Sequence, residues 1–186
     1  LEELAAVVHA RPDVMLLVDA VTSLGGSPVE TDAWGLDYVF TGTQKALALP
    51  PGMALGAVSP RLLERARGIE GRGWYLDPLK LEEGARTRVP PQTPAISLIY
   101  ALDRQLARID ARGGVEPRWQ RHAAMARMVA DWCDATPGFS LMAAPGRRSW
   151  TVSAVKVPAG QSAPTIVARL AERGWTLTTG LPPHGD

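Results

Sequence analysis

Apolar residues in the first third of the chain alternate between helical spacing and short continuous runs, which predicts alternating helices and strands. Residues 1–10 have apolar positions at helical spacing. The run VMLLVDA, residues 14–20, places five apolar residues in succession before Asp19, a pattern typical of a strand buried on both faces of a parallel sheet. Shorter strands are predicted at residues 36–42 and 53–59.

Segments farther along the chain show helical spacing together with residues that start or end helices. The first begins with proline and ends with glycine, and in the second Thr93 is the predicted N-cap with Pro94 at the first helical position. The third has one apolar stripe, which comprises Trp119, Ala123, Ala126, Val129 and Cys133. We therefore predict helices at residues 60–68, 93–114, 116–138 and 162–174.

The segments between these helices are less regular. Residues 68–93 are rich in glycine, arginine and proline and are expected to form a long surface or interface loop. Alternating residues predict a half-exposed strand at 150–158, and another strand is expected at 175–180. This order indicates an α/β protein with two domains, the first spanning residues 1–113 and the second residues 114–186.

Composition excludes several classes of partner. Twenty basic and 19 acidic residues leave a net charge of +1 without an isolated arginine block, so no nucleic acid or membrane surface is expected as a partner. Prolines and charges interrupt every apolar run, which argues against a membrane span. Cys133 is the single cysteine and cannot form an internal disulfide, which favours a reducing, cytoplasmic location. His9, His122 and His184 lack metal-ligand spacing, so no metal site is predicted.

The stretch FTGTQKALALPPG, residues 40–52, contains a lysine among small and apolar residues. The chain has three lysines and seventeen arginines, so positive charge alone is usually supplied by arginine. Unlike arginine, lysine can act as a neutral amine, and a neutral amine can form a Schiff base with a carbonyl. Lys45 is therefore a candidate nucleophile, although a solvated loop lysine would fit the same pattern.

Asp19 follows a buried strand, at the end where ligands bind in open α/β sheets. It could cap a turn or a helix. Alternatively, a carboxylate there could keep the ring nitrogen of pyridoxal phosphate protonated, so that the ring withdraws electrons from a substrate α-carbon. Because Lys45 comes just after the next predicted strand, both side chains could face one crevice.

The stretch LLVDAVTSLGGSPVETDAWGLDYVFTGTQKALALPPGMALGAVSP, residues 16–60, resembles the cofactor-binding region of class V aminotransferases. The segment QTPAISLIYALDRQLARI, residues 92–109, is similar to the long interdomain helix of the same family. Alanine–glyoxylate and serine–pyruvate aminotransferases are the nearest group by this resemblance. It implies a fold type I enzyme that depends on pyridoxal phosphate and acts as a homodimer.

The resemblance also implies roles for individual residues. Lys45 matches the lysine that holds the cofactor as a Schiff base and transfers the proton, and Asp19 matches the partner of the pyridinium nitrogen. Val21 matches an apolar residue against one face of the ring, and Gln44 matches a glutamine near the phosphate or the phenolic oxygen.

Gln92 and Thr93 match a region that reaches the partner subunit's phosphate site across the dimer interface. Val89 stands where some relatives have a tyrosine, and Thr93 is explained equally well as a helix N-cap. No residue here matches the family's glycine-rich loop, its ring-stacking aromatic or its carboxylate-binding arginine. Because the chain begins and ends within regular patterns, we expect it to be part of a longer protein.

The resulting hypothesis is transamination, in which an amino group moves from alanine or serine to glyoxylate or pyruvate through Lys45. The sequence does not decide the donor or the acceptor. Aminophosphonate transamination and cysteine desulfuration are alternatives within the family, although Cys133 lies on a helical stripe, where a mobile catalytic cysteine is not expected. A truncated, non-catalytic dimerisation module is the alternative outside enzymes.

Overall fold

The structure, a computed structural model, describes residues 1–180 of the chain, and its contacts divide it into two compact units. Unit 1 comprises Leu1–Trp119 and unit 2 begins at Gln120. The predicted boundary at residue 114 stays a prediction. Unit 1 contains α1 (Glu2–His9), β1 (Leu17–Asp19), β2 (Tyr38–Gly42), β3 (Ala54–Val58), α2 (Pro60–Arg67), α3 (Pro78–Thr87) and α4 (Ile96–Asp110). Helix α5 (Glu116–Ala135) begins in unit 1 and continues into unit 2, which also contains β4 (Ser140–Leu141), β5 (Val155–Lys156) and α6 (Ala163–Ala171).

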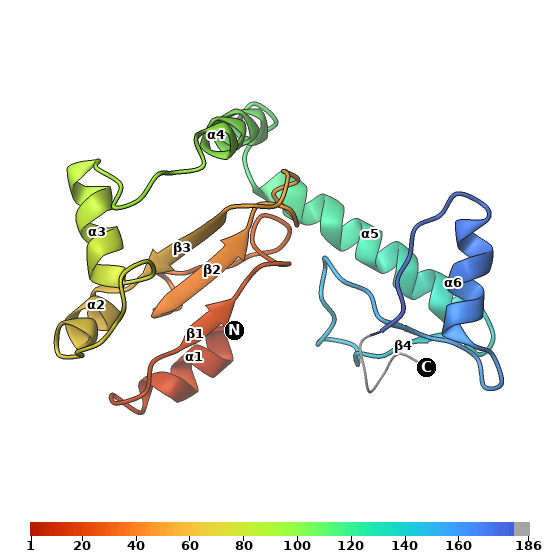
Figure 1. The fold of residues 1–186 in the computed structure, drawn as a ribbon. Helices are drawn as coiled ribbons and strands as arrows, with labels where there is room; N and C mark the ends of the chain where they lie inside the picture. The colour runs from red at the N-terminus through yellow and green to blue at the C-terminus, as the bar shows by residue number, and fades with distance from the viewer. Residues whose placement is uncertain (181–186) are drawn as a thin grey trace. The chain divides into compact units, whose positions relative to one another are not determined.

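A mixed three-stranded sheet forms the centre of unit 1, in the order β1–β2–β3 (Figure 1). Strand β1 pairs with β2 in parallel, with Asp19 opposite Phe40, and β2 pairs with β3 in antiparallel orientation. All three strands were predicted, and β2 and β3 lie within the expected ranges. Because β1 and β2 are parallel, their carboxyl ends lie at one edge of the sheet.

Strand β1 differs from the prediction in length and burial. It has three residues, and only the central Val18 is buried, in a cluster with Ala5 of α1 and Val39 of β2. Leu17 is 61% exposed, so the expectation of burial on both faces is wrong for this chain. The reason is that α1 covers the Val18 side of the strand, whereas the side chain of Leu17 remains open to solvent.

Residues 68–93 are not one long loop, because α3 lies within them. Asp77 caps this helix by accepting a hydrogen bond from the Leu79 amide at 3.0 Å, and Pro78 occupies the first turn. Asp77 also pairs with Arg72 at 3.1 Å. The Asp-Pro pair is a sequence indication of a helix start, but the glycines and prolines on both sides obscured it.

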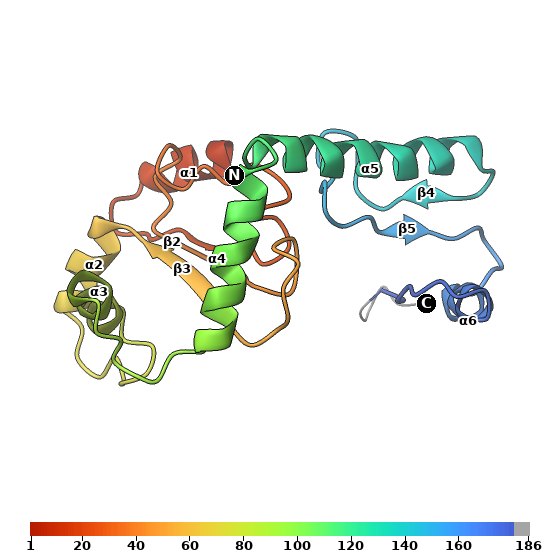
Figure 2. The same ribbon diagram turned by 90° about the horizontal axis from the view of Figure 1, so that it is seen from above.

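The predicted N-cap of α4 is also wrong. The helix begins at Ile96 with Ala95 at the cap position, and no side chain caps it. The first backbone bond of the helix runs from the Ile99 amide to the Ala95 carbonyl at 3.0 Å, so Pro94 precedes the helix. Thr93 is exposed and lies outside α4. Figure 2 shows α4 in unit 1 from above.

Unit 2 follows its predicted helices more closely than its predicted strands. Ala123 and Cys133 are buried on the expected stripe of α5. Helix α6 begins at Ala163, directly after Ser162, whose side chain caps it. The strand predicted at 150–158 is reduced to β5, which pairs with β4. No strand forms at 175–180, where the Trp175 amide instead hydrogen-bonds the Leu170 carbonyl at the end of α6. The prediction for His184 lies outside the described residues.

Arg88 at the end of α3 offers a test of backbone strain. Its φ of 60° is left-handed, and its side chain is exposed. Glycine adopts this conformation without a Cβ penalty but loses more entropy on folding. We expect Arg88→Gly to raise the free energy of unfolding by roughly 0.5–1 kcal/mol, measured by urea denaturation. Arg88→Ala, which keeps the Cβ, is the control and should give no such gain; equal effects of the two variants would contradict the explanation.

Candidate functional site

Two residues that could take part in chemistry, Asp19 and Lys45, lie at the carboxyl edge of the parallel pair β1–β2. Asp19 is the last residue of β1, and Lys45 lies in the turn that follows β2. The strands are held in register there, since the Ala20 amide donates to the Phe40 carbonyl at 2.9 Å. The topology therefore brings an acid and an amine, 26 residues apart in sequence, to one edge of the sheet.

Asp19 is partly engaged by its own turn. Its Oδ1 accepts a hydrogen bond from the Val21 amide at 2.9 Å, which fixes the direction of the carboxylate. The side chain is exposed, and Oδ2 has no hydrogen bond to the part of the chain that the structure describes. One oxygen of the carboxylate can therefore accept a hydrogen bond from an N–H or O–H group of a ligand.

Thr43 makes several of the hydrogen bonds that close the turn carrying Lys45 (residues 43–50, the Lys45 turn). The Thr43 side chain is fully buried and donates to the Pro50 carbonyl at 2.7 Å, while its amide bonds the Met53 carbonyl at 3.1 Å. The Leu49 amide returns to the Thr43 carbonyl at 3.0 Å, and the Ala48 amide donates to the Lys45 carbonyl at 2.9 Å. The backbone of Lys45 is thus part of a closed, hydrogen-bonded turn.

The side chain of Lys45 is exposed, and it forms no hydrogen bond or ion pair within residues 1–180. A surface lysine without a carboxylate partner gains no stability from an ion pair. Its amine is free to meet a carbonyl compound at the same edge as Asp19. The arrangement therefore combines an amine that has no ion-pair partner in the described chain with a carboxylate whose orientation is fixed by the Val21 amide.

Val21 and Gln44 flank these two residues. Val21 is half-buried, and its carbonyl lies 3.5 Å from the Thr41 hydroxyl of β2. The Gln44 side chain folds back over Gly42, where an added Cβ would come within 2.6 Å of Gln44 Oε1. The small residue at position 42 therefore makes room for Gln44 beside the end of β2.

Gln92 and Thr93 lie before α4, and no hydrogen bond links either side chain to the Lys45 turn among the described residues. Gln92 Nε2 donates to the Tyr75 carbonyl at 3.4 Å, and its buried Oε1 has no hydrogen-bond partner. A phosphate oxygen is also an acceptor, so Gln92 could bind one only through Nε2, which carries two N–H groups. Val89 is 68% exposed.

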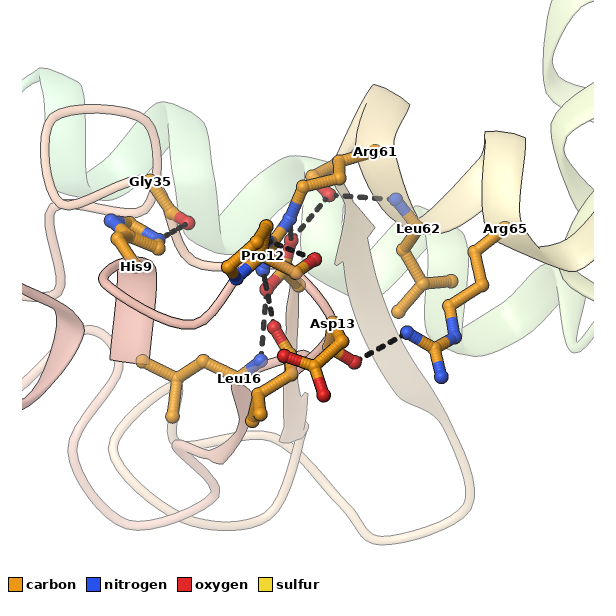
Figure 3. A network of polar contacts seen from close by, with 11 residues as sticks. His9, Pro12, Asp13, Leu16, Gly35, Arg61, Leu62 and Arg65 are labelled. Carbon is orange, nitrogen blue, oxygen red and sulfur yellow. Dashed lines mark hydrogen bonds and ion pairs between the residues drawn. The ribbon is translucent and has the colours of Figure 1, made fainter. Parts of the chain in front are cut away.

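The opposite edge of the sheet contains a polar network that sequence reasoning missed (Figure 3). Its centre is Asp37, which directly precedes β2 and is 1% exposed. Arg61 binds both of its oxygens, with Nε at 2.9 Å from Oδ1 and Nη2 at 2.6 Å from Oδ2. The Leu16 amide and the Ser59 hydroxyl also donate to Asp37. Sequence proximity could not reveal this pair, because 24 residues separate the partners.

This network joins the starts of two strands to α2. Arg61 also donates to the Val14 carbonyl at 2.7 Å, and Arg65 donates to the Asp13 carbonyl at 2.6 Å. The hydrogen bonds from Arg61 lower the pKa of Asp37 from 3.8 to about 2, against the opposing effect of burial. A bidentate, charge-assisted pair of this kind has a structural role, and it lies at the edge away from Lys45.

Within residues 1–180, Cys133, His9 and His122 do not belong to a group of potential metal ligands. Cys133 is buried in α5, and burial raises the pKa of its thiol. His9 contacts the Gly35 carbonyl at 2.9 Å. Residues 1–180 contain no group of three potential metal ligands, and none of their helices is both long enough and apolar enough to span a bilayer.

Comparisons with known proteins identify the family of this chain. The model of the class V aminotransferase family matches residues 1–182. The L-aspartate–glyoxylate aminotransferase of Paracoccus denitrificans is 35% identical over 164 residues, covering 88% of this chain and 41% of that protein. A relative with a different name, the small subunit of the soluble hydrogenase of Synechococcus sp., is 39% identical over 122 residues, covering 66% of this chain and 32% of that protein.

A solved structure of an aminotransferase also resembles this chain. The alanine–glyoxylate aminotransferase of Nostoc sp. superimposes with a TM-score of 0.86 at 32% identity, over 97% of this chain and 48% of that one. The chain thus spans between about a third and a half of the length of these proteins. The fold is accordingly that of part of the fold type I aminotransferases, a group that depends on pyridoxal phosphate, as predicted. The family match over nearly all residues shows that this chain belongs to the class V aminotransferases.

Proposed function

We propose that the protein is an aminotransferase that moves an amino group from alanine or serine to glyoxylate or pyruvate. The observation that carries this proposal is that Asp19 and Lys45 both lie at the carboxyl edge of β1 and β2. Relatives named for glyoxylate as acceptor support the acceptor half. Their donors differ, aspartate in one and alanine in the other, so the donor is the less constrained part of the proposal.

The residues at this edge fit pyridoxal phosphate. The cofactor requires an amine for its aldehyde carbon and a carboxylate for its pyridinium N–H, and Lys45 and Asp19 supply these two groups. Asp19 Oδ2 is without a protein partner in the described chain, and Oδ1 is held by the Val21 amide, so the carboxylate is already directed. When bound, the cofactor supplies an electron sink for the substrate α-carbon.

Each residue then has a defined task. Lys45 would hold the cofactor through Nζ and would carry the proton to and from the substrate α-carbon. Asp19 holds the proton on the ring nitrogen. We assign Val21 to one ring face and Gln44 to the phosphate or phenolic oxygen. Gln92 and Thr93 are assigned to a partner subunit's phosphate, and in the described chain neither side chain hydrogen-bonds the Lys45 turn.

The organisation around this site is part of the same proposal. Residues 1–113 would belong to the large cofactor-binding domain and residues 114–186 to the small domain. The protein would be a cytoplasmic homodimer, and the single cysteine supports a reducing location. Cysteine desulfuration is disfavoured because Cys133 is buried in a helix and its thiol pKa is raised, whereas a catalytic thiol needs exposure and a lowered pKa.

Reductive labelling tests the proposal directly. Full-length protein is incubated with pyridoxal phosphate and reduced with borohydride, and the modified peptides are mapped by mass spectrometry. We expect the label on Lys45 and not on Lys80 or Lys156, the other lysines of this chain. Labelling spread evenly over the three would indicate non-specific reaction of surface amines, and absence of label would favour a non-catalytic dimerisation module.

A further inference from the structure

The Lys45 turn is held from outside by two side chains that come much later in the sequence. Gln105 of α4 donates through Nε2 to the Leu47 carbonyl at 2.7 Å, across 58 residues of sequence. Arg118 of α5 donates through Nη2 to the Ala46 carbonyl and through Nε to the Gly25 carbonyl, the latter at 3.2 Å. All these residues belong to unit 1. The two carbonyls directly after Lys45 therefore both accept hydrogen bonds from donors that are distant in the sequence.

The turn does not satisfy these carbonyls itself. Its internal hydrogen bonds use the carbonyls of Thr43, Lys45 and Pro50. The carbonyls of Ala46 and Leu47 point to donors outside the turn. A half-buried carbonyl that loses its donor costs free energy unless water or a movement of the backbone replaces the bond. Without Gln105 and Arg118, two carbonyls next to Lys45 would lose their donors, and this loss would favour movement of the backbone there.

Backbone strain in the turn strengthens this argument. Ala48, three residues after Lys45, has a φ of 57°, in the left-handed region that residues with a Cβ rarely adopt. Such a conformation persists only when the surrounding contacts impose it. Ala48 is exposed and gains little from packing, so the hydrogen bonds on either side of it must hold it. The residue immediately before Ala48 is Leu47, which is buried against Gly25. Its carbonyl accepts the hydrogen bond from Gln105.

We propose that Gln105 and Arg118 are positioning residues, which hold the Ala46 and Leu47 carbonyls and thereby fix the backbone from which Lys45 reaches the carboxyl edge. They act through the turn, and neither is assigned a contact with substrate or cofactor. Arg118 also links the turn to Gly25 in the segment after β1, so one guanidinium connects the turn after β2 with the segment after Asp19. The role in catalysis rests on the proposed function; the effect on the turn does not.

The test compares full-length variants that lose the donor and keep the size of the side chain. Arg118→Met and Gln105→Met remove the hydrogen bonds singly and together, and Arg118→Lys keeps the charge without the fork. Arg121→Met is the matched control, since Arg121 is exposed on the same helix and makes no hydrogen bond or ion pair in the described chain. Amide hydrogen exchange of Ala48 and Leu49 is measured without cofactor, and Lys45 labelling is measured against pyridoxal phosphate concentration.

For the double variant we expect amide exchange at Ala48 and Leu49 to accelerate by about tenfold, and half-maximal labelling of Lys45 to need about tenfold more cofactor. Arg118→Lys should fall between Arg118→Met and the wild type, and Arg121→Met should match the wild type. Wild-type exchange and labelling in the double variant would overturn the proposal, as would faster exchange throughout unit 1, which indicates general destabilisation.

The two proposals fail in different ways. If the wild-type protein shows no label on Lys45, the proposed function is wrong, while the exchange of Ala48 and Leu49 still decides whether the two side chains hold the turn. If Lys45 is labelled but the variants exchange and label as the wild type does, only the positioning role is wrong. Should the double variant not fold, Gln105→Met alone removes one neutral hydrogen bond and serves in its place.

Discussion

Replacing Lys45 with alanine is expected to abolish covalent attachment of pyridoxal phosphate and to lower the transamination rate by at least about 10²–10⁴-fold, the range that one acid–base group contributes. The reason is that Lys45 would both bind the cofactor through Nζ and move the proton at the substrate α-carbon. No other lysine of this chain lies at the carboxyl edge of β1 and β2: Lys80 is in α3 and Lys156 in β5. The measurement is the single-turnover rate with alanine and glyoxylate.

Lys45→Arg separates this explanation from a purely electrostatic one. Arginine keeps the positive charge but has no neutral amine at accessible pH, so it should be as inactive as alanine. Lys80→Ala is the matched control and should retain the wild-type rate, since Lys80 lies 3.0 Å over the ring of Trp74 in an unrelated contact. Substantial activity in Lys45→Arg would show that the amine is not used as proposed.

Replacing Asp37 with alanine is expected to lower the free energy of unfolding by about 3 kcal/mol, the lower end of the range for breaking a buried ion pair. The lower end applies because the Arg61 side chain is 36% exposed and water can solvate it after the loss. The Leu16 amide and the Ser59 hydroxyl also lose their acceptor. Urea denaturation of the full-length protein measures the change.

Two variants decide whether the buried pair causes this loss. Asp32→Ala removes an exposed carboxylate five residues earlier and should change the free energy of unfolding by less than about 0.5 kcal/mol. Asp37→Asn keeps the shape but loses the charge, so it should fall between the wild type and Asp37→Ala. If Asp32→Ala and Asp37→Ala were equally mild, the network would have no structural role.

The same pair predicts how stability depends on acid. The folded-state pKa of Asp37, about 2, lies below the value of 3.8 for a free aspartate, because Arg61 binds the ionised form. This stabilisation, about 2 kcal/mol, is therefore fully present above about pH 5 and is lost progressively as the pH falls from about 5 to about 1. Comparison of the wild type with Asp37→Asn over this pH range isolates the contribution of this carboxylate.

Local sequence patterns predicted the elements whose cause is local. Helix α2 begins at Pro60 after the Ser59 cap, and α6 begins after the Ser162 cap, because a hydroxyl and a following proline favour a helix start by themselves. Predictions that needed a partner elsewhere in the chain were less successful. The strand expected at 150–158 keeps only two residues of β5, since a strand forms only where a neighbour supplies hydrogen bonds.

In the candidate site, too, the sequence indicated some residues and only the tertiary structure distinguished others. Residue types and spacing singled out Asp19 and Lys45, since an aspartate that ends an apolar run and a lysine among small residues are both unusual. Gln105 and Arg118 could not be found in this way, because a glutamine and an arginine on a helix resemble any other solvated residues. Only their hydrogen bonds to Leu47 and Ala46, across a long stretch of sequence, distinguish them.

The sequence by itself determined the class of fold, the family resemblance and the two candidate residues of the site, because these depend on residue type and short-range order. The tertiary structure alone decided that Asp37 is buried against Arg61 and that distant side chains hold the Lys45 turn. The physical reason is that hydrogen bonds and burial depend on which surfaces meet when the chain folds. That meeting is set by the packing of whole elements, which short-range patterns do not encode.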